Sequence, residues 1–199
     1  MTDKQLAVKC VQMLETYLEE VKKLPNNNKK MLTLAGSDMT DWKNTYYPQL
    51  SQSGKIRDGV FFQSPLKDLR YGIGNDGVAT KLEYLQFLWS AYKFILGDFP
   101  ASGETLTRVK GCIKMLEPYA AKFESQGTGI STCFELNKED MEKWKSEYYP
   151  KLSESGMVPD ASYFGSTANM GIGNDGKFYA EEFCHFLFRL YRQAYIILN

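Results

Sequence analysis

Apolar residues recur every three or four positions near the start of this chain, which is the pattern of a helix with one buried face. The members of this stripe are Leu6, Cys10, Met13, Leu14, Tyr17, Leu18 and Val21. They predict a helix over Lys4–Leu24, and a similar stripe predicts another over Leu106–Phe123. Pro118 lies inside the second helix, where the first has Thr16. Because proline removes a backbone donor and crowds the preceding turn, the sequence predicts a kink or break there.

Two further helices are predicted in each half of the chain. One begins near Ser37 and again near Asn137, which are residue types favoured at helix N-caps. It ends at Gly54 and at Gly156, since glycine commonly follows a helix C-terminus. The last helix of each half covers residues 80–96 and 180–198. The expected total is six helices with little sheet.

The sequence contains an internal repeat. The segment WKNTYYPQLSQSG, Trp42–Gly54, returns as WKSEYYPKLSESG over Trp144–Gly156. The hexapeptide GIGNDG, Gly72–Gly77, returns unchanged as Gly171–Gly176. This repetition predicts a mostly α-helical tandem duplication, in which each three-helix unit has about 100 residues.

The expected domain boundaries follow from the repeat. Residues 1–100 form the first predicted unit and residues 101–199 the second. The stretch Gly97–Glu104 is rich in turn-forming residues and reads as the linker. Because units this small are only marginally stable alone, the two are expected to pack together with approximate two-fold symmetry.

Charge and hydropathy argue against two classes of protein, nucleic-acid-binding proteins and membrane proteins. The chain has 24 basic and 24 acidic residues and no net charge. Neither half has a basic surface, which disfavours a nucleic-acid reader that works through phosphate contacts. No signal-like N-terminal pattern and no apolar run of membrane-spanning length occurs. The sequence therefore predicts a soluble, cytoplasmic protein with no membrane partner.

The repeated hexapeptide opens a loop that resembles the second half of an EF-hand calcium loop. In that family position five is Asp or Asn, position six is a turn glycine and position twelve is a bidentate Glu. The matching residues are Asp76, Gly77 and Glu83 in one copy, and Asp175, Gly176 and Glu182 in the other. The resemblance implies a Ca²⁺ site in each copy, with the four carboxylates as ligands. Backbone carbonyls around Gly72, Gly74, Gly77, Gly171, Gly173 and Gly176 would complete it.

Two other interpretations of this loop stay open. Gly and Asn-Asp-Gly also form good turns, because they tolerate positive φ. Thr80 and Glu83 have the spacing of a helix capping box. A phosphate-binding loop is disfavoured, since no Lys-Ser/Thr pair follows Gly77 and the third glycine of a dinucleotide fingerprint is missing.

Two aromatic clusters are a candidate binding surface for a sugar, a base or a partner protein. Their members are Trp42, Tyr46 and Tyr47, and Trp144, Tyr148 and Tyr149. The alternative is that each Trp packs inward. The single histidine, His185, excludes a multi-histidine metal site. Cys10 and Cys112 occupy equivalent positions and are expected to be small buried side chains.

The inventory of catalytic residues is thin, so the sequence favours binding over catalysis. The leading hypothesis is a non-enzymatic binding protein with two related loops that bind calcium in an EF-hand-like manner. The alternative is a metal-free protein-interaction module, such as an inhibitor, immunity or scaffold protein, in which the loops are structural turns. The third hypothesis is an enzyme of unfamiliar type, for which Asp76 and Glu83 are the candidate acid–base pair of a hydrolysis. In the first two, the expected partner is another protein.

Overall fold

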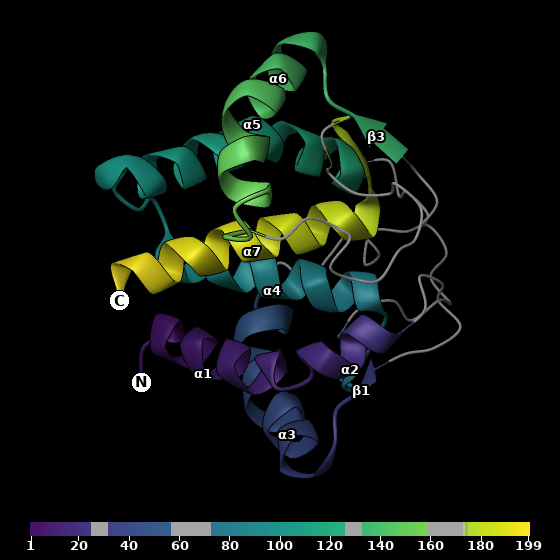
Figure 1. The fold of residues 1–199 in the computed structure, drawn as a ribbon. Helices are drawn as coiled ribbons and strands as arrows, with labels where there is room; N and C mark the ends of the chain where they lie inside the picture. Colours follow the sequence, from purple (N-terminus) through teal and green to yellow (C-terminus); the bar gives the residue numbers. More distant parts are fainter. Residues whose placement is uncertain (25–31, 57–72, 126–132, 159–172, 174) are drawn as a thin grey trace. The chain divides into compact units, whose positions relative to one another are not determined.

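The structure is a computed structural model of the full chain (Figure 1). It describes residues 1–24, 32–56, 73–125, 133–158, 173 and 175–199. The chain divides into two compact units, Met1–Gly97 and Asp98–Asn199. The prediction of a mostly helical protein is confirmed.

The described elements follow the same order in each unit. The first unit contains α1 (Asp3–Glu15), α2 (Leu18–Lys23), β1 (Leu32–Thr33), α3 (Gly36–Asp41), η1 (Trp42–Gln52), β2 (Val78–Ala79) and α4 (Lys81–Leu96). The second contains α5 (Gly103–Ser125), β3 (Cys133–Glu135), α6 (Lys138–Lys143), η3 (Trp144–Ser153), β4 (Lys177–Tyr179) and α7 (Ala180–Leu198). In each unit the first helix packs along the last, α1 on α4 and α5 on α7.

The break predicted at Pro118 does not occur, since α5 runs unbroken through this residue. Pro118 and Lys114, four residues before it, are both exposed. Water can therefore bond the carbonyl of Lys114 that loses its backbone donor, and the helix continues.

The first unit, which has no proline here, is the one that breaks. The Tyr84 hydroxyl donates a hydrogen bond to the Leu14 carbonyl, which also accepts the Tyr17 N–H at 3.0 Å in a tightened last turn. The Thr16 hydroxyl donates to the Met13 carbonyl at 2.7 Å. The equivalent of Tyr84 in the repeat is Phe183, which has no hydroxyl to donate. The hydrogen bond at the break therefore has no counterpart in the second unit, where the first helix is continuous.

The second predicted helix is an α-helix that widens into a π-helix at the tryptophan. Thus α3 passes into η1, and α6 passes into η3. Pro48 and Pro150 lie inside the wide segments, where the looser i→i+5 turn relieves the crowding that proline causes in an α-helix. After each π-helix, Gly54 and Gly156 have φ of +74° and +72°, as predicted for a helix end.

The predicted N-caps of these helices have different outcomes. Asn137 caps α6, accepting the Asp140 N–H at 2.9 Å, as predicted. In the first unit the cap is Ala35 and not Ser37, because α3 begins at Gly36, two residues earlier than a cap at Ser37 would give. Ala35 has no side-chain acceptor; instead its own N–H donates to the Tyr17 hydroxyl at 3.2 Å.

Short strands hold the start of the second helix to the start of the last one. Strand β1 pairs antiparallel with β2, and β3 pairs antiparallel with β4. Leu32 lies opposite Ala79, and Phe134 opposite Phe178. The matched pairs Phe61–Phe62 and Tyr163–Phe164, for which the sequence leaves open a short strand or irregular packing, lie outside the described residues. The pairing places the repeated glycine turn, which precedes β2 and β4, beside the second helix.

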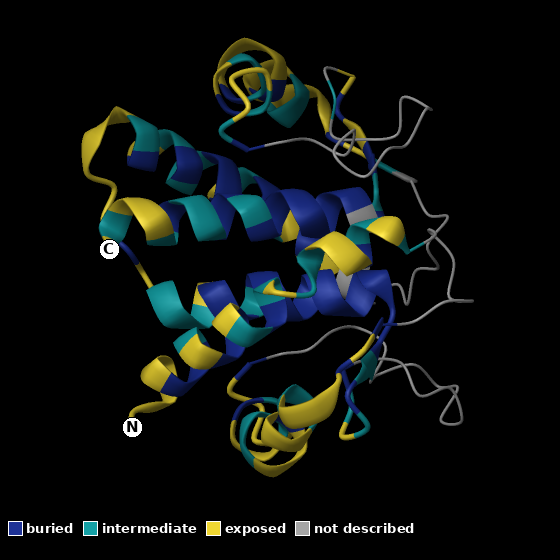
Figure 2. Cartoon of the chain, turned by 60° about the horizontal axis from the view of Figure 1, so that its bottom comes forward, coloured by how far each residue is buried: buried dark blue, intermediate teal, exposed yellow. Residues whose placement is uncertain are grey.

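Figure 2 shows that burial concentrates on the first and last helices of each unit, while α3 and α6 have no buried residue. The largest fully buried side chains are Trp42, Trp144, Tyr84, Phe87, Phe178, Phe183, Phe186, Phe188, Leu14, Leu32, Leu50 and Ile56. The second helix of each unit is therefore attached through a few side chains rather than through a broad apolar face.

Candidate functional site

The described part of each repeated loop is a tight glycine turn. The Gly77 N–H donates to the Gly74 carbonyl at 3.0 Å, and the Gly176 N–H donates to the Gly173 carbonyl at 3.0 Å. Gly77 and Gly176 have φ of +68° and +66°, a region that favours glycine. The first glycines of the hexapeptides, Gly72 and Gly171, lie outside the described residues.

A methionine packs directly beneath the second turn glycine. A Cβ added to Gly77 would lie 2.5 Å from the Met39 sulfur and 2.9 Å from its methyl carbon. At Gly176 an added Cβ would lie 2.6 Å from the Met141 methyl carbon. The backbone conformation therefore favours glycine here, and a Cβ would also require the methionine side chain of α3 or α6 to shift.

The two predicted aspartate ligands close the turn from within. Asp76 Oδ1 accepts the Val78 N–H at 3.2 Å, and Asp175 Oδ1 accepts the Lys177 N–H at 3.1 Å. An Asp side chain that bonds the backbone two residues later is a common device for stabilising turns. In both copies one carboxylate oxygen is thus committed to the chain itself.

The two predicted glutamate ligands act as helix caps. Glu83 Oε2 accepts the Thr80 N–H at 2.8 Å, and the Thr80 hydroxyl accepts the Glu83 N–H at 3.3 Å, which completes a capping box. Glu182 Oε2 accepts the Tyr179 N–H at 2.7 Å. The Glu83 and Glu182 side chains are 0% and 6% exposed. Both carboxylates lie at the buried starts of the last helices, where negative charge complements the helix dipole.

The tryptophans of the repeated segment reach back to the turn. Trp42 Nε1 donates to the Gly74 carbonyl at 2.7 Å, and Trp144 Nε1 donates to the Gly173 carbonyl at the same distance. Each of these carbonyls therefore accepts two hydrogen bonds, one from the turn and one from the indole. This contact joins the π-helix to the glycine turn in both units.

The predicted aromatic surface divides into buried and accessible members. Trp42 and Trp144 are 0% exposed, and each lies edge-on to a phenylalanine of the last helix of its unit. Their indoles are core residues and offer no face to a ligand. Tyr148 is also buried. The remaining members, Tyr46, Tyr47 and Tyr149, are half-buried.

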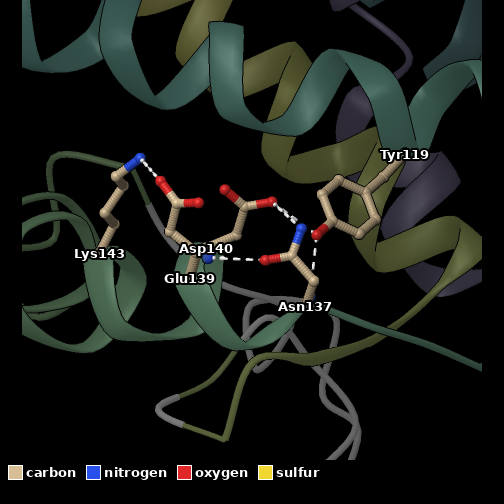
Figure 3. Close-up of polar contacts among 5 residues, drawn as sticks. All are labelled: Tyr119, Asn137, Glu139, Asp140 and Lys143. Carbon is tan, nitrogen blue, oxygen red and sulfur yellow. Dashed lines mark hydrogen bonds and ion pairs between the residues drawn. The ribbon is translucent and has the colours of Figure 1, made fainter.

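A polar network that the sequence analysis did not single out joins the first helix to the second (Figure 3). The Tyr119 hydroxyl donates to Asp140 Oδ2 at 2.7 Å and accepts the Asn137 N–H at 2.9 Å. In the first unit the Tyr17 hydroxyl donates to Asp38 Oδ2 at 2.8 Å. The sequence repeat could have revealed this network, because the same Tyr and the same Asp occur at equivalent positions of both units.

The donor set around each turn fits an internally bonded turn better than a cation site. A calcium site needs six to eight oxygen ligands. Here the described aspartate, glutamate and carbonyl candidates each accept hydrogen bonds from the chain. Among the residues that the structure describes, no three His, Cys, Asp or Glu side chains are grouped to hold a metal ion.

The other reactive side chains are enclosed. Burial raises the pKa of the Cys10 and Cys112 thiols, so both are protonated and poorly nucleophilic at neutral pH. Cys184 is likewise free and buried. His185 is 0% exposed and accepts a hydrogen bond from Arg189 Nε to its Nε2 at 3.4 Å. These groups form no catalytic arrangement among the described residues.

No family model, curated protein or solved structure matches this chain. In the described residues, none of the helices combines the length and apolar character that crossing a membrane requires.

Proposed function

We propose that this protein is a non-enzymatic, metal-free binding protein in which the two GIGNDG loops are structural turns. The observation that carries the proposal is the hydrogen bond from each indole to a turn carbonyl, 2.7 Å in both units. An ion that used these carbonyls would have to displace the indole N–H. It would also compete with the bonds that Asp76 and Glu83 already make to the backbone.

We also infer that the two units arose by duplication of one ancestral unit. Three hydrogen bonds recur at equivalent positions, which supports this inference beyond the repeated letters. They join Tyr17 to Asp38 and Tyr119 to Asp140, Trp42 to Gly74 and Trp144 to Gly173, and Tyr92 to Glu15 and Tyr191 to Glu117. The turn is then part of the inherited scaffold, and the surfaces that differ between units carry the binding function.

A protein partner in the cytoplasm completes the proposal. The exposed residues of the second helices support a protein as the partner, because they differ between the units: α6 begins with the charged residues Lys138 and Glu139, whereas α3 has Gly36 and Ser37 at these positions. Cys10, Cys112 and Cys184 are free thiols, which is usual in a reducing compartment.

Thermal unfolding in EGTA, in millimolar Ca²⁺ and in millimolar Mg²⁺ tests the metal-free proposal. An ion that binds only the folded state would raise the midpoint by mass action. We expect identical midpoints in the three conditions. The control is the double variant Glu83→Gln, Glu182→Gln, whose amide oxygens still accept the capping bonds but bind calcium poorly. A Ca²⁺-specific rise that this variant abolishes would replace our proposal with the EF-hand-like calcium protein.

A further inference from the structure

The second helix of each unit contacts the glycine turn with the end of a methionine side chain. The Met39 sulfur and methyl carbon of α3 fill the space where Gly77 has no side chain, 2.5 and 2.9 Å from the position of an added Cβ. Met141 of α6 fills the same space at Gly176. The two methionines occupy equivalent positions of the sequence repeat. The contact is therefore built into both units.

Both methionines are open to solvent on one side. Helices α3 and α6 contain no buried residue, and Met39 and Met141 are half-buried. A thioether within reach of solvent is readily oxidised to a sulfoxide, whereas the Cys10 and Cys112 thiols are fully buried. The same sulfur atoms thus combine access to an oxidant with contact to the turn.

The turn is poorly suited to accept a sulfoxide in place of a thioether. Three N–H groups around the contact already donate within the chain: Gly77 to the Gly74 carbonyl, Val78 to Asp76 Oδ1, and Leu34 to the Gly77 carbonyl. The same three bonds recur in the second unit. Leu34 Cβ lies 3.6 Å from the position of the added Cβ, so part of the surroundings is apolar. A polar oxygen placed there loses its bonds to water without gaining these donors.

We propose that Met39 and Met141 are oxidation sites for hydrogen peroxide, and that their sulfoxides release α3 and α6 from the glycine turns. The sulfur lone pair attacks one peroxide oxygen and the O–O bond breaks. The sulfur keeps that oxygen, and the other leaves as water with both protons. The thioether is oxidised and the peroxide is reduced. Methionine sulfoxide reductases reverse the change, so the release is a switch.

The release is local, because each helix keeps a second attachment. The Tyr17 hydroxyl bonds Asp38 Oδ2 beside Met39, and the Tyr119 hydroxyl bonds Asp140 Oδ2 beside Met141 (Figure 3). These bonds tether α3 and α6 when the methionine contact is lost. Oxidation is therefore expected to speed the local opening of these helices rather than to unfold the unit.

The test treats the full-length protein with hydrogen peroxide, maps the sulfoxides by peptide mass spectrometry and then measures amide hydrogen exchange. We expect Met1, which is 76% exposed, to oxidise first, and Met39 and Met141 to follow. Once both are oxidised, the amides of α3 and α6 should exchange about tenfold faster. Treatment with methionine sulfoxide reductases should restore the slow exchange.

The double variant Met39→Leu, Met141→Leu keeps an apolar side chain of similar volume but has no sulfur to oxidise. Peroxide should leave its exchange over α3 and α6 within about twofold of the untreated rate. The matched control is Met13→Leu, Met115→Leu, which removes two half-buried sulfurs at equivalent positions of α1 and α5. This control should respond to peroxide as the wild type does.

Three results would overturn the inference. Met39 and Met141 could stay reduced at a peroxide dose that fully oxidises Met1, which would show that the sulfurs are inaccessible. Both could oxidise without faster exchange, which would show that the contact does not hold the helices. The Met39→Leu, Met141→Leu variant could respond as the wild type does, which would assign the effect to other side chains. None of these results involves calcium, so failure here is distinguishable from failure of the metal-free proposal.

Discussion

At the scale of single residues, one hydroxyl group differs between the unit with a broken first helix and the unit with a continuous one. Tyr84 in α4 donates to the Leu14 carbonyl at the point where the chain breaks between α1 and α2. The repeat has Phe183 at this position and a continuous α5. Local propensity at Thr16 and Pro118 predicts the opposite result, so a contact distant in sequence overrides it.

Tyr84→Phe is expected to destabilise the protein by about 1 kcal/mol, because one buried hydrogen bond is lost. It should also let the Leu14 carbonyl accept the Leu18 N–H, which joins α1 to α2. Denaturant unfolding measures the first effect and amide exchange at Leu18 the second. Tyr92→Phe is the matched control: it removes a hydroxyl of the same helix that donates to the Glu15 side chain. If the Leu18 amide exchanges equally fast in both variants, the explanation of the break is wrong.

The turn glycines offer a second residue-scale test. Gly77→Ala combines a positive φ with a Cβ placed against the Met39 sulfur, and is expected to cost about 2–4 kcal/mol. Gly54→Ala has a similar φ but nothing within 4 Å of the new Cβ, so it should cost only about 1–2 kcal/mol. Denaturant titration of both variants gives the difference. Equal losses would mean that Met39 does not hold α3 against the turn.

At the scale of elements, the six helical regions were predictable because each carries a long apolar stripe or a repeated segment. The strands were not, since β1 and β2 are two residues long and form only through pairing with each other. The widening of the second helix was not predictable either, because a proline in sequence predicts an interruption and not a π-helix.

In the candidate site, too, the sequence predicted the local features and missed the long-range contact. The sequence identified the turn and the capping box, because both depend on neighbouring residues. It could not identify the bond from Trp42 to Gly74, since that contact joins residues 32 positions apart in the chain. This non-local bond is the one that distinguishes a structural turn from a cation site.

The helix pairs α1–α4 and α5–α7 should be sensitive to alkaline pH. Burial raises the pKa of Cys10 and Cys112, so above the unfolded thiol pKa, about 8.5, the unfolded chain releases protons that the folded chain keeps. Stability is therefore full below that pH and falls as pH rises. Cys10→Ala should reduce the slope of unfolding free energy against pH by up to about 1.4 kcal/mol per pH unit between pH 9 and 10. An unchanged slope would show that the thiol ionises while folded.

At the scale of the whole molecule, two units share one polar framework and differ at their surfaces. The framework consists of the indole–carbonyl, Tyr–Asp and Tyr–Glu hydrogen bonds, each present twice. The surfaces differ, for example, where α6 has Lys138 and Glu139 and α3 has Gly36 and Ser37. A shared framework with differing surfaces is the arrangement that our proposal of a binding protein requires.

The most direct test of the central claim is the NMR signal of the indole N–H groups in protein labelled with ¹⁵N-tryptophan. The chain has three tryptophans, and Trp89 serves as an internal reference because it is not part of a repeated turn. We predict that the Trp42 and Trp144 signals are protected from solvent exchange and do not move on addition of millimolar Ca²⁺. Movement of both signals with Ca²⁺, while Trp89 stays fixed, would contradict the account and show that the loops bind the ion.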